Sequence, residues 1–299
     1  MPVRVVPRED EHVYDDRQGV DFATAVSKCP ATAERPQAVD IDTDIYKPSI
    51  ARANLAPSTE QPEGSPEYID ALDLQNYTVL QQHCMFWDRD RDGVIWPKDT
   101  FTGFHELGFN LFFCFLATLV INLSFSYPTR LGVSYIPDPY FRLYLPSIHK
   151  AKHGSDSGTY DREGRFVPQA FEDMFSKWDA GDKGALSAGE LWNMIAANRL
   201  VADPFGWAAA IFEFGVTWLL VQQDGMVDKE DLRRIYDGSM FFKVRDAYRS
   251  EKGWNKGFGL REFFNLGREQ LAKNQSKFPS LGGVVSQVEK TVTRKLRRA

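Results

Sequence analysis

The sequence lacks the marks of several common protein classes. Among its 299 residues it has only three cysteines, Cys29, Cys84 and Cys114, and their spacing shows no pairs. The first ten residues carry charges and no apolar stretch, so we expect no secretory signal peptide. An odd number of cysteines without a signal argues against a disulfide framework and predicts a reducing compartment.

Nucleotide and nucleic-acid chemistry also lack their usual signatures. No glycine-rich nucleotide-binding motif is present, and GSDSG at 154–158 has aspartate where a nucleophile elbow needs serine. The net charge of −5 excludes a chain that is basic as a whole, so we expect no nucleic-acid partner. With 43% apolar and 26% charged residues, the composition is that of a folded chain. Its 299 residues are enough for one large domain or two small ones.

Both ends of the chain differ from its middle. Residues 1–70 are rich in proline and keep no apolar period, which predicts a disordered N-terminal tail. Residues 251–299 form a C-terminal extension, whose part 271–299 holds seven basic residues, one acidic residue and one apolar stripe at helical spacing. Such a basic amphipathic helix fits a membrane surface or a partner helix, and equally a tail helix that docks on the core.

Three aspartates within five positions dominate the segment 86–97. A twelve-residue calcium loop needs oxygen ligands at positions 1, 3, 5, 7 and 12 and a glycine at position 6. Gly93 stands at position 6, and Ile95 stands at position 8, where two such loops pair through a short strand contact. The predicted ligands are Asp88, Asp90, Asp92, the carbonyl of Val94, and Asp99.

Asp99 departs from the usual pattern of such loops. Position 12 is usually glutamate, which binds the ion with both oxygens, and Asp99 is one methylene shorter. We therefore predict a Ca²⁺ site with weakened affinity, at which the smaller Mg²⁺ competes.

Three further segments resemble the first loop but lack ligands. Residues 179–190 have no oxygen side chain at positions 3 and 5, and residues 222–231 have no ligand at position 1. Residues 160–173 keep only the turn and strand pattern, which chance also explains. These segments predict a mainly α-helical fold of EF-hand-like helix-loop-helix modules, one able to bind metal and the others degenerate scaffolds.

A long apolar segment follows the aspartates. Residues 107–129 contain no charge, and their length suffices to cross a hydrocarbon core of about 30 Å. Two asparagines interrupt the run, Pro128 stands at its end, and Pro137 and Pro139 follow. We expect a membrane-associated helix or a hairpin that dips into one leaflet; a buried core helix is the alternative. A second run, 204–221, carries Glu213 at its middle, so we interpret it as an amphipathic or buried helix, one that could lie at an interface.

The chain has only five histidines. His83 lies five residues before Asp88, and His149 and His153 are spaced so that both lie on one helical face. That spacing suits zinc, but no third ligand is evident.

The chain resembles the caleosins, which are calcium-binding, lipid-droplet-associated proteins, many of them haem peroxygenases. The resemblance runs from about residue 74 to 247, and its motifs are LQQHCMFWDRDRDGVIWPKD, IHKAKHGSDSGTYDREGRFVPQAFEDMFSKW and DPFGWAAAIFEFGVTWLL. The mix of features favours a fungal member. The resemblance implies a domain over 71–250, with an EF-hand at 75–110, an apolar segment with a proline knot at 107–140, and a degenerate half at 145–250. The spacing of these prolines differs from the plant knot.

The resemblance further implies a haem b cofactor with two associated histidines, His83 and His153. A peroxygenase must leave one axial iron position open for the hydroperoxide. We therefore expect His83 as proximal ligand and His153 as the distal acid–base residue or a displaceable second ligand.

The expected function is that of a calcium-binding haem peroxygenase that uses fatty-acid hydroperoxides to epoxidise or hydroxylate unsaturated lipids. The expected location is the lipid-droplet surface and the ER or microsomal membrane, on the cytosolic face, and a homo-oligomer is compatible with this. The alternative is a non-catalytic, calcium-responsive structural protein of lipid droplets, since no C-x-x-C-H haem motif is present. A soluble sensor with a methionine-rich groove is disfavoured, because the chain has only six methionines.

Overall fold

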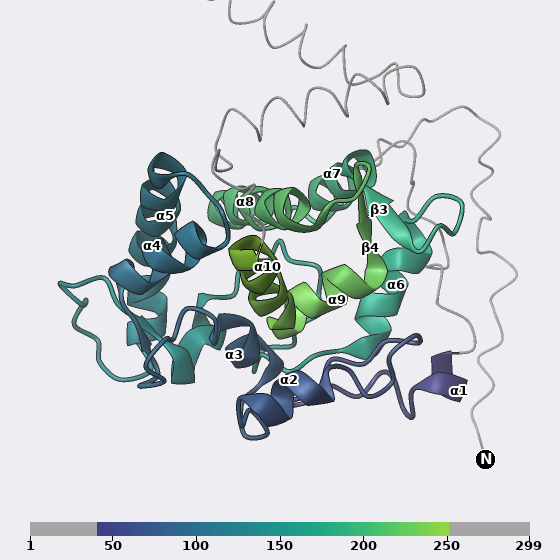
Figure 1. The fold of residues 1–299 in the computed structure, drawn as a ribbon, viewed down its shortest axis with the longest axis horizontal. Helices are drawn as coiled ribbons and strands as arrows, with labels where there is room; N and C mark the ends of the chain where they lie inside the picture. The colour runs from purple at the N-terminus through teal and green to yellow at the C-terminus, as the bar shows by residue number, and fades with distance from the viewer. Residues whose placement is uncertain (1–40, 251–299) are drawn as a thin grey trace, which may run out of the picture.

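The computed structural model describes residues 41–250, and this part of the chain is mainly helical, as predicted (Figure 1). The first half consists of α1 (Ile41–Asp44), α2 (Pro66–Ala71), α3 (Val79–Cys84), β1 (Val94–Ile95), α4 (Pro97–Glu106), α5 (Leu111–Arg130), β2 (Leu143–Tyr144) and the 3-10 helix η2 (Leu145–Ala151). The second half consists of α6 (Pro168–Trp178), β3 (Ala185–Ser187), α7 (Ala188–Ala197), α8 (Pro204–Val221), β4 (Met226–Asp228), α9 (Lys229–Asp237) and α10 (Ser239–Ser250).

Two short antiparallel sheets pair loops that are far apart in the sequence. In the second half Leu186 lies opposite Val227, so the loop 179–190 pairs with the loop 222–231. In the first half Ile95 lies opposite Leu143, which follows the apolar helix. Ile95 therefore forms a short strand contact, but its partner is the segment after α5 and not one of the predicted loops.

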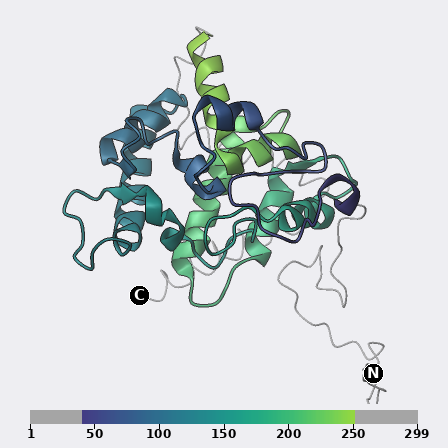
Figure 2. The same cartoon turned by 90° about the horizontal axis from the view of Figure 1, so that it is seen from below.

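One aromatic-rich core holds both halves together. Its fully or nearly fully buried members come from α4, α5, α6, the β3–β4 pair and α9, and include Phe104, Phe113, Phe171, Leu186, Val227 and Leu232. A smaller cluster beside α3 contains Leu74, Met85 and Leu145. In both views α4, α5 and the loop after them lie on one side of the molecule, away from α1 and α6 (Figures 1 and 2).

Residues 41–65, which we call the N-terminal strap, are packed against the second half. Ala56 and Ser58 are fully or almost fully buried, and the main chains of Arg52 and Phe166 exchange two hydrogen bonds, at 2.6 and 2.8 Å. The packed part of the chain thus starts before residue 71, and the predicted tail is wrong for residues 41–70, because two short helices and hydrogen bonds to distant elements order this segment without an apolar period. Residues 1–40 and the predicted extension 251–299, with its basic amphipathic helix, lie outside the described residues.

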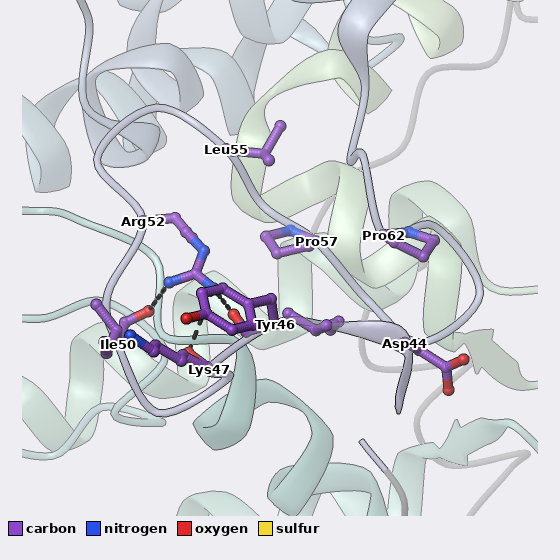
Figure 3. A pocket seen from close by; sticks show the side chains of 9 residues that line it. Asp44, Tyr46, Lys47, Ile50, Arg52, Leu55, Pro57 and Pro62 are labelled. Carbon is purple, nitrogen blue, oxygen red and sulfur yellow. Dashed lines mark hydrogen bonds between the residues drawn. The ribbon is translucent and has the colours of Figure 1, made fainter. Parts of the chain in front are cut away.

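The strap folds around a hollow of about 530 Å³ beside Arg52 (Figure 3). The Arg52 guanidinium donates to the carbonyls of Ile50, at 2.7 Å, of Lys47, at 3.3 Å, and of Tyr46. Since these donors bind carbonyls of residues 46–50, Arg52 stabilises the conformation of this loop.

Candidate functional site

His83 lies in the last turn of α3, with its ring held by another helix. A capping box fixes the start of α3, in which Gln81 N–H donates to Thr78 Oγ1 at 3.3 Å and Thr78 N–H donates to Gln81 Oε1 at 2.9 Å. His83 Nδ1 is 2.7 Å from the carbonyl oxygen of Ile235 in α9. Because a carbonyl only accepts, Nδ1 carries the proton and donates, and Nε2 of the neutral ring keeps its lone pair.

Gly238 makes this contact between helices possible. It caps α9 in the left-handed conformation, with φ of +83°. A Cβ at this position would lie 2.5 Å from the carbonyl oxygen of Gln82 and 2.8 Å from Cα of His83. Only glycine therefore lets the end of α9 approach the backbone of α3 this closely.

The surroundings of His83 keep its imidazole neutral. Burial lowers the pKa of His83, and the opposing effects of the Ile235 carbonyl, Glu213 and Asp237 do not restore it. The ring packs edge-on against Phe241, with centroids 5.1 Å apart. A neutral imidazole whose Nδ1–H is fixed by a carbonyl is the form that binds a metal through Nε2.

His153 follows η2 and faces the carboxylate in the middle of α8. Its Nε2 is 3.6 Å from Glu213 Oε2, and its Nδ1 is buried without a hydrogen-bond partner among the described residues. Burial disfavours the imidazolium, but Glu213 outweighs it, so the pKa of His153 is raised. His153 therefore differs from His83 by holding a proton more readily.

The loop that carries His153 is tied to the start of α8. Asp203 caps α8 by accepting from Gly206 N–H at 2.9 Å, and the same carboxylate accepts from the N–H and hydroxyl of Ser155, at 3.0 and 2.6 Å. Asp203 thus fixes His153 relative to the helix that carries Glu213.

Glu213 connects the two histidines, and our sequence reasoning gave it no role in the site. Its negative charge opposes the lowering of the pKa of His83 by burial and raises the pKa of His153, so one carboxylate acts electrostatically on both rings. The sequence did contain a signal for a role of Glu213, because it is the one charged residue in the 18-residue helix α8. His149, the other half of the predicted histidine pair, lies in η2.

The predicted cation loop brings three carboxylates together. Ligand oxygens of Asp88, Asp90 and Asp92 all lie within 4.8 Å of one another. Gly93, with φ of +79°, turns the chain so that its N–H donates to Asp88 Oδ2 at 3.0 Å. Asp88 is 3% exposed, and its Oδ1 has no hydrogen-bond partner among the described residues. Burial, Asp92 and Asp90 raise the pKa of Asp88, as expected for a carboxylate whose counter-charge is a cation. The arrangement fits a divalent ion.

The other two predicted ligands have different positions. Val94 begins β1, and its N–H donates to Asp92 Oδ1 at 2.8 Å. Asp99 lies outside the group of three, and its Oδ2 accepts from Trp96 N–H at 3.0 Å at the start of α4. The shorter side chain thus caps the helix.

The polar residues of the apolar helix α5 lie mainly on its buried side, together with Phe113, Cys114 and Ala117, and its exposed residues are apolar. Its buried side carries Thr118, Asn122, Ser126 and Thr129. Its exposed side carries Leu111, Phe112, Phe115, Leu119, Val120, Leu123 and Tyr127. The next loop adds exposed Leu131, Val133, Tyr135, Ile136, Tyr140 and Phe141. Exposed apolar residues in this number on one helix and its following loop are consistent with membrane or lipid association.

The shape of α5 corrects one expectation. The helix continues through Pro128 to Arg130, so the apolar run is one helix and not a hairpin, and Asn110 is its N-cap. Pro137 and Pro139 lie in the loop that follows. By length and composition α5 and α8 are the two described helices able to cross a membrane, and α5 has the smaller buried share, 33% against 50%.

Comparison with known proteins gives the family. The model of the caleosin family, described as caleosin related protein, matches residues 75–245. A peroxygenase of Lilium longiflorum is 37% identical over 74% of this chain and 90% of its own length. From Arabidopsis thaliana, "Probable peroxygenase 4" is 38% identical over 58% of this chain and 88% of its own length. A "probable inactive peroxygenase-like protein" of the same plant is 32% identical over 52% of this chain and 73% of its own length. No solved structure matches.

Proposed function

The chain belongs to the caleosin family, and from this premise we propose that it is a calcium-binding haem peroxygenase that oxidises unsaturated lipids at a lipid surface. Its relatives named peroxygenase, at 37% and 38% identity, support the enzyme class. The observation that carries the proposal is the neutral His83 imidazole, locked at Nδ1 by the Ile235 carbonyl.

His83 would hold haem b through Nε2, because the hydrogen bond from Nδ1 to Ile235 leaves the lone pair of Nε2 free to bind iron. The haem, when bound, supplies the transfer of one oxygen atom from a hydroperoxide to an alkene, which yields an alcohol and an epoxide. The Ile235 carbonyl fixes the His83 tautomer and ring orientation, and its negative end makes Nε2 more basic.

His153 would move the proton of the hydroperoxide. It takes the O–H proton when the hydroperoxide binds and returns it to the oxygen that leaves as the alcohol. Glu213 supports the protonated state by its position 3.6 Å from Nε2, and Asp203 holds the loop in place through Ser155.

The outer side of α5 would contact the lipid. Its exposed residues are apolar, while Thr118, Asn122, Ser126 and Thr129, which lipid would reject, are buried. This location brings the site to substrates that partition into lipid, at lipid droplets or the ER membrane. The Asp88 loop leads into α4, the helix before α5, and Ca²⁺ held there would offset two of the three negative charges of its carboxylates.

The test uses the full chain loaded with haemin and assayed with a fatty-acid hydroperoxide and an unsaturated acceptor. We expect His83→Ala to lose the Soret band and epoxide formation together, and His153→Ala to keep most of the haem but lose turnover. His149→Ala is the matched control and should keep both. Full haem occupancy in His83→Ala would refute the assignment of the ligand.

A structural role without catalysis is the second candidate, because the apolar side of α5 needs no haem to bind lipid. The inactive relative, as it is named, shares 32% identity with this chain. A chain that binds phospholipid vesicles but gains no Soret band and forms no epoxide with haemin would favour this role.

A further inference from the structure

Two twelve-residue loops, one starting at Asp88 and one at Asp179, fold in the same way. In both, positions 4 and 6 have left-handed backbones, with φ of +59° and +79° in the first loop and +51° and +66° in the second. In both, the N–H of the glycine at position 6 donates to the aspartate at position 1, at 3.0 and 2.7 Å. The second loop therefore has the backbone of an ion-binding loop, although its sequence lacks ligands at positions 3 and 5.

Lys183 stands at position 5 of the second loop. Its ammonium donates to Asp179 Oδ1, to the Ala180 carbonyl at 2.8 Å and to Glu190 Oε1 at 3.0 Å. Asp179 and Glu190 are positions 1 and 12, which bind the ion in a loaded loop. The ammonium therefore binds two of the oxygens, at positions 1 and 12, that would otherwise bind a divalent ion.

The same arrangement occurs in two shorter loops of the chain. Arg142 Nε donates to Asp138 Oδ2 at 2.7 Å, and Arg165 Nε donates to Asp161 Oδ2 at 2.6 Å, each four residues apart. In both loops the aspartate also accepts from backbone N–H groups of its own turn. A side-chain cation four residues after a turn aspartate is thus a repeated feature.

The Asp88 loop differs from these three loops. Its residue four positions on is Asp92, and Asp88 Oδ1 has no hydrogen-bond partner among the described residues. The nearby Arg89 binds Glu106 instead, at 2.9 and 3.1 Å. This loop therefore needs an external cation where the others have an internal one.

We propose that Lys183 is a built-in cation that fills the ion position of the loop 179–190 and keeps it closed without a divalent ion. The loop 179–190 leads into α7, the helix before α8 with Glu213, and its partner loop 222–231 leads into α9 with Ile235; Glu213 and the Ile235 carbonyl are the two groups that contact the histidines. These elements are thus held in place at any concentration of divalent ion, and ion binding acts through the Asp88 loop. The proposal does not rest on the peroxygenase activity.

The test replaces the built-in cation by a ligand. Lys183→Asp places a carboxylate at position 5 beside Asp179 and Glu190. We expect the variant to bind one more equivalent of Tb³⁺ than the wild type, seen as luminescence sensitised by Trp178 next to the loop. Lys150→Asp, at an exposed lysine, makes the same change of charge and should add none. The same stoichiometry in Lys183→Asp, Lys150→Asp and wild type would overturn the proposal, whatever number the wild type binds.

A second measurement tests the proposal if Lys183→Asp does not fold. Lys183→Gln removes the charge and leaves Asp179, 4% exposed, facing Glu190. We expect its melting temperature to fall by roughly 2–8 °C. Adding Glu190→Gln removes the repulsion and should restore part of that loss. A Lys183→Gln variant that melts with the wild type would refute the role of the ammonium.

Discussion

Asp88→Asn should change the stability of the protein in opposite directions with and without calcium. Three carboxylates within 4.8 Å repel one another by roughly 1–3 kcal/mol per pair, depending on the local dielectric. Asp88 takes part in two of the three pairs and is 3% exposed, so its charge also has a desolvation cost. Asparagine keeps the oxygen that accepts from Gly93 N–H. Without divalent ions we therefore expect the free energy of unfolding to rise by about 1–2 kcal/mol.

Calcium should reverse this order. An ion that binds only the folded state adds about 2.7 kcal/mol when its concentration is one hundred times its Kd. The wild type gains this, while Asp88→Asn, with one carboxylate fewer and a neutral group at position 1, gains little. The assay is thermal unfolding in EDTA and in millimolar CaCl₂.

Asp224→Asn is the matched control, since Asp224 is exposed and its backbone is left-handed, which asparagine tolerates. It should respond to calcium like the wild type. A chain in which Asp88→Asn is less stable than the wild type in EDTA, or in which both respond equally to calcium, would contradict a cation at this loop.

Three further predictions concern the supports of the site. Arg233→Met should lower the free energy of unfolding by about 3–5 kcal/mol in urea titration, because it leaves the buried carboxylate of Asp237 without its counter-charge. Burial raises the pKa of Asp138, but hydrogen bonds from Arg142 and from its own turn lower it to about 2. A carboxyl with a lowered pKa stabilises the fold above about pH 4, and this stabilisation is lost as the pH falls to 2. The stability difference between wild type and Arg142→Gln, about 1 kcal/mol after screening by solvent, should therefore shrink over that range in acid unfolding curves. Gly238→Ala should cost about 2 kcal/mol or more and displace His83, seen as a shifted Soret band or weaker haem retention in reconstituted protein.

The spacing of oxygen ligands let the sequence predict the Asp88 loop, since each position has one physical task. The same template predicted residues 179–190 as a degenerate scaffold, but it gave no role to Lys183, whose ammonium binds Asp179 and Glu190. A template of ligands cannot recognise a cation supplied by the chain itself. The i, i+4 spacing of aspartate and a basic residue was a usable signal.

The apolar run contained a signal that sequence reasoning did not use. Asn122 appeared as a flaw in a membrane segment, but Thr118, Asn122, Ser126 and Thr129 recur at spacings of four, four and three, which is one helical stripe. A polar stripe on an apolar helix predicts that the stripe is buried and the apolar residues face outward. The contact from Ile235 to His83, in contrast, involves a backbone carbonyl, and only Gly238 hinted at it.

The buried charges of α9 explain why a proline-rich strap belongs to the support of a histidine. Lys229 at the start of α9 binds Glu172 of α6 at 2.6 Å and Glu60 of the strap at 2.7 Å. Arg233, one turn later, donates to the strap carbonyl of Ala56 at 3.0 Å. These contacts hold α9 against rotation and against sliding along its axis. Two residues beyond Arg233, the same helix carries the Ile235 carbonyl that accepts from His83. A strap that moved would rotate α9 and with it the hydrogen bond that sets the His83 tautomer, so residues 56–65 influence the ring without touching it.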